Sequence, residues 1–92
     1  MAKKIKRSFK IINQKGLHAR ASAKFVETVE LFDASAEIWR DGLNACGNSI
    51  MGLLMLAASQ GTSIDVEIHG VQSIELADAL ETLIGNRFGE DH

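Results

Sequence analysis

Apolar residues recur along this chain with two different spacings. A period of two, which predicts strands with one buried face, is found at residues 4–12, 34–40 and 62–68. A spacing of three or four, which predicts an amphipathic helix, is found at residues 19–32 and again after Ser73. The pair Asp41-Gly42 predicts a hairpin turn before a short strand at 43–46, and an apolar helix is predicted at 50–58.

The predicted order is therefore strand, helix, strand, strand, helix, strand, helix. When all the helices cover one face of an antiparallel sheet, the result is a two-layer α+β domain with one sheet face open to solvent. A chain of 92 residues is long enough for one such core, so we expect a single domain over residues 1–92. The expected core includes Ile5, Phe9, Ile11, Ala21, Phe25, Val29, Phe32, Ile64, Val66 and Ile68.

Charge and aromatic content argue against a nucleic-acid binder. The net charge is −2, whereas general nucleic-acid binding needs a basic surface. The basic residues at 3–7 are interrupted by Ile5 and begin a strand pattern, so we interpret them as a solvated sheet edge. Trp39 is the one tryptophan and there is no tyrosine, which leaves no paired platform for stacking bases. A small ligand-binding or RNA-binding domain is accordingly disfavoured.

Cysteine and histidine usage predicts neither a disulfide nor a metal site. Cys46 is the one cysteine, which excludes an internal disulfide and suits a reducing compartment. His18, His69 and His92 show no ligand spacing with it. The N-terminal lysines are not followed by the apolar segment of a signal peptide, and no run of 18 apolar residues occurs. We therefore expect a cytoplasmic protein that neither enters a membrane nor binds a metal or other cofactor.

The segment Gly-Leu-His-Ala-Arg at residues 16–20 places His18 at the junction of a strand and a helix. Backbone N–H groups without partners and the positive end of the macrodipole favour anions at a helix start. A phosphoryl group on the imidazole would meet that field, and the guanidinium of Arg20 would share its oxygens. Gly16 permits backbone angles that other residues resist. The alternative is that His18 is a weak cap or an ordinary surface residue.

The helix predicted at 50–58 is apolar on nearly every side, which is more than one buried face requires. We expect Leu53, Leu56 and Ala57 to face the core. We expect Ile50, Met51 and Leu54 to lie on or near the outer face, where aliphatic and methionine side chains suit docking to several partners. The alternatives are a helix buried on both sides or one covered in a homodimer, although we expect a monomer.

Several residues are assigned to helix ends. Ser49 is an expected N-cap, and the same serine is a candidate phosphorylation site because a helix start accommodates a phosphate. Its two negative charges would then lie beside Ile50 and Met51 and would weaken docking. Gly61 is expected just after the second helix, and Ser73 is expected to cap the third. Residues 89–92 are expected to fray.

Together, Gly-Leu-His-Ala-Arg at 16–20 and Ser-Ile-Met-Gly-Leu at 49–53 resemble HPr, the histidine phosphocarrier family of bacterial phosphotransferase systems. The resemblance covers nearly the whole chain. It implies an open-faced β-sandwich with a four-stranded antiparallel sheet and three helices on one side. It implies a carrier rather than an enzyme: His18 accepts a phosphoenolpyruvate-derived phosphoryl group on Nδ1 from phosphorylated enzyme I and passes it to an enzyme IIA. Arg20 would balance the charge, and Ser49 would be modified where an HPr kinase/phosphorylase is present.

Two positions depart from the family pattern. Ala21 stands where the family usually has proline, so the loop that holds His18 loses one source of rigidity. Asn48 stands where regulated members often have lysine, which weakens the case for modification of Ser49.

Ala21 and the apolar second helix also resemble members of a nitrogen-related branch, which feed a regulatory enzyme IIA instead of a sugar permease. A rival hypothesis is a regulatory binding module that uses the apolar helix and Ser49 without phosphoryl transfer through His18.

Overall fold

A computed structural model describes residues 3–92, so Met1 and Ala2, with which the expected domain begins, lie outside the described residues. The helices and strands follow the predicted order. They are β1 (Lys3–Lys10), α1 (Ala19–Glu30), β2 (Ser35–Arg40), β3 (Leu43–Cys46), α2 (Ile50–Met55), β4 (Ser63–Gly70), α3 (Ser73–Gly85) and the 3₁₀ helix η1 (Arg87–Gly89).

The four strands form one antiparallel sheet in the order β1-β4-β2-β3. The expected α+β architecture with an open-faced sheet is therefore confirmed. Strand β1 lies at an edge, as the basic cluster at its start predicted. Lys4 and Lys6 both lie near the carboxylate of Glu67 on β4, at 3.5 and 3.6 Å, so these charges are paired across the solvent-facing side of the sheet.

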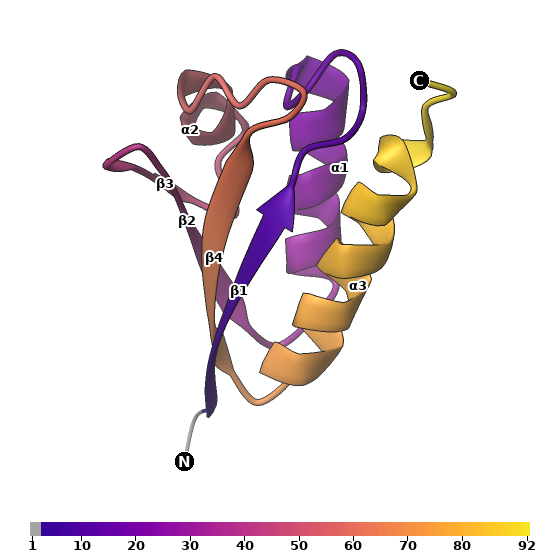
Figure 1. Ribbon diagram of the computed structural model, residues 1–92. Helices are drawn as coiled ribbons and strands as arrows, with labels where there is room; N and C mark the ends of the chain where they lie inside the picture. Colours follow the sequence, from indigo (N-terminus) through magenta and orange to yellow (C-terminus); the bar gives the residue numbers. More distant parts are fainter. Residues whose placement is uncertain (1–2) are drawn as a thin grey trace.

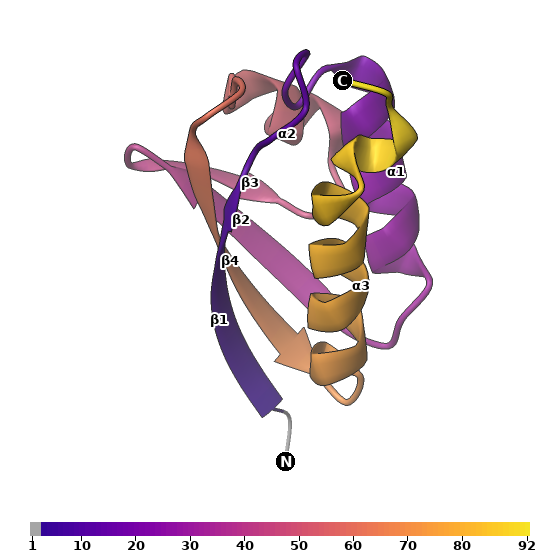
Figure 2. The ribbon, with the colours of Figure 1, turned by 45° about the vertical axis from the view of Figure 1, so that its right-hand side comes forward.

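Helices α1 and α3 run side by side along one face of the sheet (Figures 1 and 2), and α2 packs against β3 and α1. The core lies between these layers. Phe25 of α1 and Ile64 and Ile68 of β4 are fully buried, as their spacing predicted. At the margins, Ile5 and Phe32 are only partly buried. The alternation of apolar and polar residues along the strands therefore decides which sheet face the helices cover.

Helix α2 is shorter than predicted. It ends at Met55, and the next two amides donate back to the carbonyls of Leu53 and Leu54. Ala57 has a φ of +50°, a left-handed conformation that stops the helix. Leu53 and Leu56 are buried as expected, but Ala57 is exposed, which corrects its assignment to the core.

The position expected of Gly61 is also wrong. It follows α2 by several residues and belongs to the turn before β4, where its amide donates to the carbonyl of Ile11 at 2.7 Å. The true left-handed position after α2 is occupied by Ala57. Periodicity could not show this, because residues 50–58 are apolar throughout and carry no signal of where the helix stops.

Both ends of α3 differ from the predictions. Ser73 is its first residue and not its cap, and the cap position belongs to Gln72, whose side-chain oxygen accepts the amide of Asp33 at 2.7 Å. After α3 the chain does not fray: η1 forms, and the side chain of Phe88 is 1% exposed. Burial of this aromatic ring in the core anchors the last residues.

Candidate functional site

The loop between β1 and α1 is built on Gly16. Gly16 has a φ of +67°, and a Cβ at this position would lie 2.4 Å from the carbonyl oxygen of Ala58. That close approach allows the amide of Leu17 to donate to the same oxygen at 2.9 Å. The loop before His18 is thus joined to the segment that follows α2, which confirms the backbone role predicted for Gly16.

His18 occupies the N-cap position of α1. Its backbone is extended, with φ −77° and ψ −177°, and its carbonyl accepts the amide of Ser22 at 2.8 Å. The imidazole makes no capping hydrogen bond with the helix, so no side chain at this position satisfies the first amides of α1. The side chain is 26% exposed. A partly accessible imidazole therefore lies at the positive end of a helix of 12 residues.

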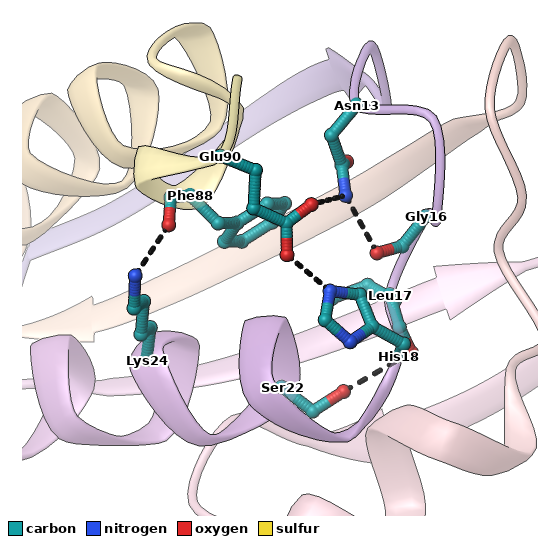
Figure 3. Close-up of polar contacts among 8 residues, drawn as sticks. All are labelled: Asn13, Gly16, Leu17, His18, Ser22, Lys24, Phe88 and Glu90. Atoms are coloured by element: carbon teal, nitrogen blue, oxygen red, sulfur yellow. Dashed lines mark hydrogen bonds and ion pairs between the residues drawn. The ribbon is translucent and has the colours of Figure 1, made fainter. Parts of the chain in front are cut away.

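Glu90, which follows η1, contacts His18. One carboxylate oxygen, Oε2, is hydrogen bonded to Nε2 of the imidazole (Figure 3). The other, Oε1, accepts from the side-chain amide of Asn13 at 3.0 Å. The same Asn13 nitrogen donates to the carbonyl of Gly16 at 2.8 Å. Residues from the loop before α1 and from the segment after α3 thus meet at one imidazole.

The Glu90 carboxylate is held in its ionised form. Burial alone raises the pKa of Glu90, whose side chain is 14% exposed. Hydrogen bonds from Asn13 and His18, together with the positive charges of Lys15 and of His18 when its ring is protonated, outweigh burial and leave the pKa below its ordinary value of 4.5. At neutral pH this group is therefore an acceptor only.

Sequence reasoning missed Glu90 because residues 89–92 were expected to fray. Further contacts hold this segment in place: Lys24 of α1 donates to the carbonyl of Phe88 at 2.6 Å, and the amide of Gln14 donates to the carbonyl of His92 at 2.9 Å. The available signal was Phe88, an aromatic residue in an otherwise polar segment, which indicates that the chain returns to the core. No sequence pattern indicated that Glu90 would reach His18.

Arg20 lies two residues beyond His18, in the first turn of α1, and is exposed. Within residues 3–92 its guanidinium forms no hydrogen bond or ion pair. It lines a hollow of about 310 Å³ together with Lys15, Lys24 and the segment 89–92. His18 does not line this hollow, so the structure places the predicted pair in neighbouring positions at the start of α1, without a hydrogen bond between their side chains in the described part of the chain. A guanidinium fork binds phosphoryl oxygens with good geometry.

Ser49 caps α2, as predicted. Its side-chain oxygen accepts the amide of Gly52 at 3.0 Å, which is the ordinary contact of an N-cap serine. The hydroxyl is part-buried at the start of the helix. This position is compatible with a phosphate on electrostatic grounds, and the modification itself stays a prediction.

The outer face of α2 carries exposed apolar side chains. Met51 is 70% exposed, Ile50 is 40% exposed and Met55, which was not expected there, is 76% exposed. Leu54 is only half-buried and does not project as fully as predicted. We call Ile50, Met51 and Met55 the α2 surface. Helix α2 lies at the same end of the molecule as the start of α1 (Figure 1), so this surface and His18 share one end.

Among the helices that the structure describes, none has both the length and the apolar composition to cross a bilayer. The working parts of the candidate site are a partly exposed imidazole, an uncapped helix start, a free guanidinium and a neighbouring apolar surface. An unprotonated imidazole nitrogen can act as a nucleophile, and a helix start with a guanidinium nearby favours anions.

Comparisons with known proteins agree on one family. The family model described as "PTS HPr component phosphorylation site" matches residues 5–86. The chain is 45% identical to the phosphocarrier protein HPr of Neisseria meningitidis serogroup A, over 94% of this chain and 97% of that protein. It is 44% identical to the HPr of Cupriavidus necator, with the same coverage. A crystal structure of HPr from Thermoanaerobacter tengcongensis is similar with a TM-score of 0.90 and 34% identity, covering 96% of this chain and 99% of that one. The chain therefore belongs to the HPr family of phosphocarrier proteins of the phosphotransferase system.

Proposed function

We propose that this chain carries a phosphoryl group on His18, which it accepts from phosphorylated enzyme I and passes to an enzyme IIA. The observation that supports the proposal most directly is the position of His18 as the N-cap of α1, partly exposed and with no capping hydrogen bond from its side chain. A phosphoryl group on this ring would meet the first amides of the helix. The protein would accept the phosphoenolpyruvate-derived phosphoryl group, transfer it to the acceptor and return to its unphosphorylated form.

The transfer is a displacement at phosphorus. A lone pair of the His18 imidazole forms the new N–P bond while the N–P bond to the donor histidine breaks, and the electron pair of that bond stays on the donor ring. Little covalent chemistry is required of the carrier, so positioning and charge stabilisation account for its part. The partner supplies the rest of the site, and the carrier is in this sense not an enzyme.

Arg20 is proposed to neutralise the charge of the phosphorylated imidazole. Its guanidinium is exposed and forms no competing ion pair within the described residues, so turning toward His18 would break no existing contact. The binding must remain modest, because a phosphoryl group that is held too tightly does not leave.

The α2 surface is proposed to dock enzyme I and the enzyme IIA in turn. Exposed methionine and isoleucine side chains can repack against different partners. Where an HPr kinase/phosphorylase is present, phosphorylation of Ser49 would place nearly two negative charges beside Ile50 and Met51. Docking would weaken without a change of fold, since the serine already lies at a helix start. Whether the acceptor belongs to a sugar or a nitrogen-related branch is decided by offering both kinds of enzyme IIA.

The first experiment incubates the protein with enzyme I and phosphoenolpyruvate and analyses the phosphate that it acquires. We expect a phosphate that is labile in acid and stable in base, as a phosphoramidate is, and that is lost in His18→Ala. The matched control is His69→Ala, which removes a half-exposed histidine of β4 on the solvent-facing side of the sheet. Absence of label on the wild-type protein with a competent enzyme I, or label that survives in His18→Ala, would contradict the proposal. The first result would favour a binding module that acts through the α2 surface.

A further inference from the structure

We propose that Glu90, held in place by Asn13, is a positioning residue that keeps the proton of the neutral His18 ring on Nε2 and so leaves the lone pair of Nδ1 free to attack phosphorus. The part that concerns the reaction rests on the proposed function. The part that concerns the proton does not, because it is a property of the protein alone.

The contact between Glu90 and His18 defines which atom must donate. An ionised carboxylate has no proton, so the hydrogen bond at Nε2 requires an N–H on that nitrogen. A neutral imidazole carries one N–H, so a proton on Nε2 leaves Nδ1 unprotonated. In Figure 3 the second ring nitrogen points away from Glu90, and within residues 3–92 it has no hydrogen-bond partner. Nδ1 is thus both unprotonated and unobstructed by these contacts.

Asn13 fixes the carboxylate. This residue is fully buried, and its Nδ2 donates both to Glu90 at 3.0 Å and to the Gly16 carbonyl at 2.8 Å. The orientation of its amide follows from these partners: both are acceptors, so a rotated amide would direct its oxygen at two other oxygens. Asn13 therefore holds one carboxylate oxygen and leaves the other directed at His18.

The position of the proton matters for the chemistry. With the proton on Nε2, the Nδ1 lone pair forms the bond to phosphorus, the donor N–P bond breaks and no proton has to be removed first. The ring then carries a positive charge and still has its proton on Nε2, opposite the Glu90 carboxylate, which stabilises that charge. With the proton on Nδ1, a base would have to remove it before attack at this nitrogen, and the described contacts of His18 include no such base.

Glu90→Gln is the most informative variant because it keeps the shape of the side chain. Glutamine has one side-chain oxygen, and Asn13 and an Nε2 proton would compete for it. When that oxygen accepts from Asn13, the glutamine NH₂ faces Nε2 and favours the tautomer with the proton on Nδ1. The matched control is Glu27→Gln, the same substitution at an exposed residue of α1 that forms no side-chain hydrogen bond or ion pair within residues 3–92.

The test measures the tautomer of His18 by long-range ¹H–¹⁵N correlation in uniformly labelled protein, at a pH where the ring is neutral. We expect the wild type and Glu27→Gln to show the Nε2–H form. We expect Glu90→Gln to lower the ratio of Nε2–H to Nδ1–H on the order of tenfold, since hydrogen bonds to charged groups are worth about that factor or more. Backbone amide spectra verify that all three proteins are folded.

A second measurement follows the rate of phosphorylation by enzyme I and phosphoenolpyruvate. We expect Glu90→Gln to slow phosphorylation through kcat, while Glu27→Gln leaves the rate near the wild-type value. The proposal is overturned if the wild-type ring is mainly Nδ1–H, if Glu90→Gln matches the wild type in both measurements, or if Glu27→Gln changes the tautomer as much as Glu90→Gln does. Failure of the proposed function is distinct: the wild-type protein would then acquire no phosphate, whatever its tautomer.

Discussion

At the scale of single residues, Gly16 has a double role in the site. Its positive φ makes the turn before His18, and its missing side chain lets the backbone approach Ala58. The two requirements are separable in principle, because strain at positive φ arises within the residue whereas the close approach involves another segment. The chain offers a comparison in Gly61, which has a φ of +89° and open space where a Cβ would lie.

We expect Gly16→Ala to destabilise the protein by at least about 2 kcal/mol, because left-handed strain adds to the clash with the Ala58 carbonyl. Gly61→Ala, with the strain alone, should cost about 1 kcal/mol. Urea denaturation of the two variants and the wild type measures both values. Equal losses for the two variants would show that the segment after α2 moves away freely and that the loop before His18 is not held by it.

At the scale of elements, the short helix α2 combines two tasks. It buries Leu53 in the core, and it presents Met51 and Met55 to solvent at the end of the molecule where α1 begins. A helix of six residues has little stability of its own, so packing and the Ser49 cap hold it. A charge on its outer face should therefore affect docking more than folding, provided that the cap is kept.

We expect Met51→Asp to raise the KM of enzyme I for this protein roughly tenfold, because a charge in the centre of an apolar contact must be desolvated. Ser49→Asp should act in the same direction, as a partial mimic of phosphoserine that can still cap the helix. The control is Val71→Asp, which puts the same charge on a residue that is 73% exposed in the turn between β4 and α3. Steady-state kinetics with each variant as substrate checks this, and an equal effect of Val71→Asp would place docking elsewhere.

At the scale of the whole molecule, the segment after α3 connects two parts of the chain that are far apart in sequence, the end of α3 and the loop before α1. Phe88 is buried in the core, and Glu90 binds Asn13 and His18 next to the start of α1. The folded state therefore stabilises the ionised form of the Glu90 carboxylate relative to the unfolded chain. A group whose pKa is lowered by folding contributes stability above its unfolded pKa, and that stability is lost as the pH falls through the folded value.

We therefore expect the free energy of unfolding of the wild type to exceed that of Glu90→Gln at neutral pH. The difference should narrow as the pH falls below 4.5, the ordinary value of the Glu90 pKa, because the carboxylate becomes protonated and resembles the amide. Denaturation curves collected between neutral and acidic pH measure the difference. If this difference in the free energy of unfolding stayed constant down to the lowest pH measured, the ionised carboxylate would not be what stabilises the folded state.

The architecture was predictable from the sequence, because alternation and helical spacing determine which side chains can share a core. Phe25 and Ile64 are examples. His18 was singled out because a helix start favours anions and Arg20 follows two residues later. The errors lie where local pattern carries no information. Residues 50–58 are apolar throughout, so the sequence pattern could not show at which residue α2 ends. Glu90 reaches His18 only through the burial of Phe88 and the buried amide of Asn13, which are tertiary contacts between distant segments.

The strand order has a consequence for how the protein is made. Within residues 3–92, strand β1 pairs with β4 alone, so it stays without its partner in the sheet until residues 63–70 have been synthesised. The carbonyl of Ala58 and the carboxylate of Glu90, which hold the two sides of the His18 loop, also come late in the chain. A nascent chain on the ribosome can form the β2–β3 hairpin early, but the loop before His18 lacks its contacts with Ala58 and Glu90 until residue 90 has been synthesised.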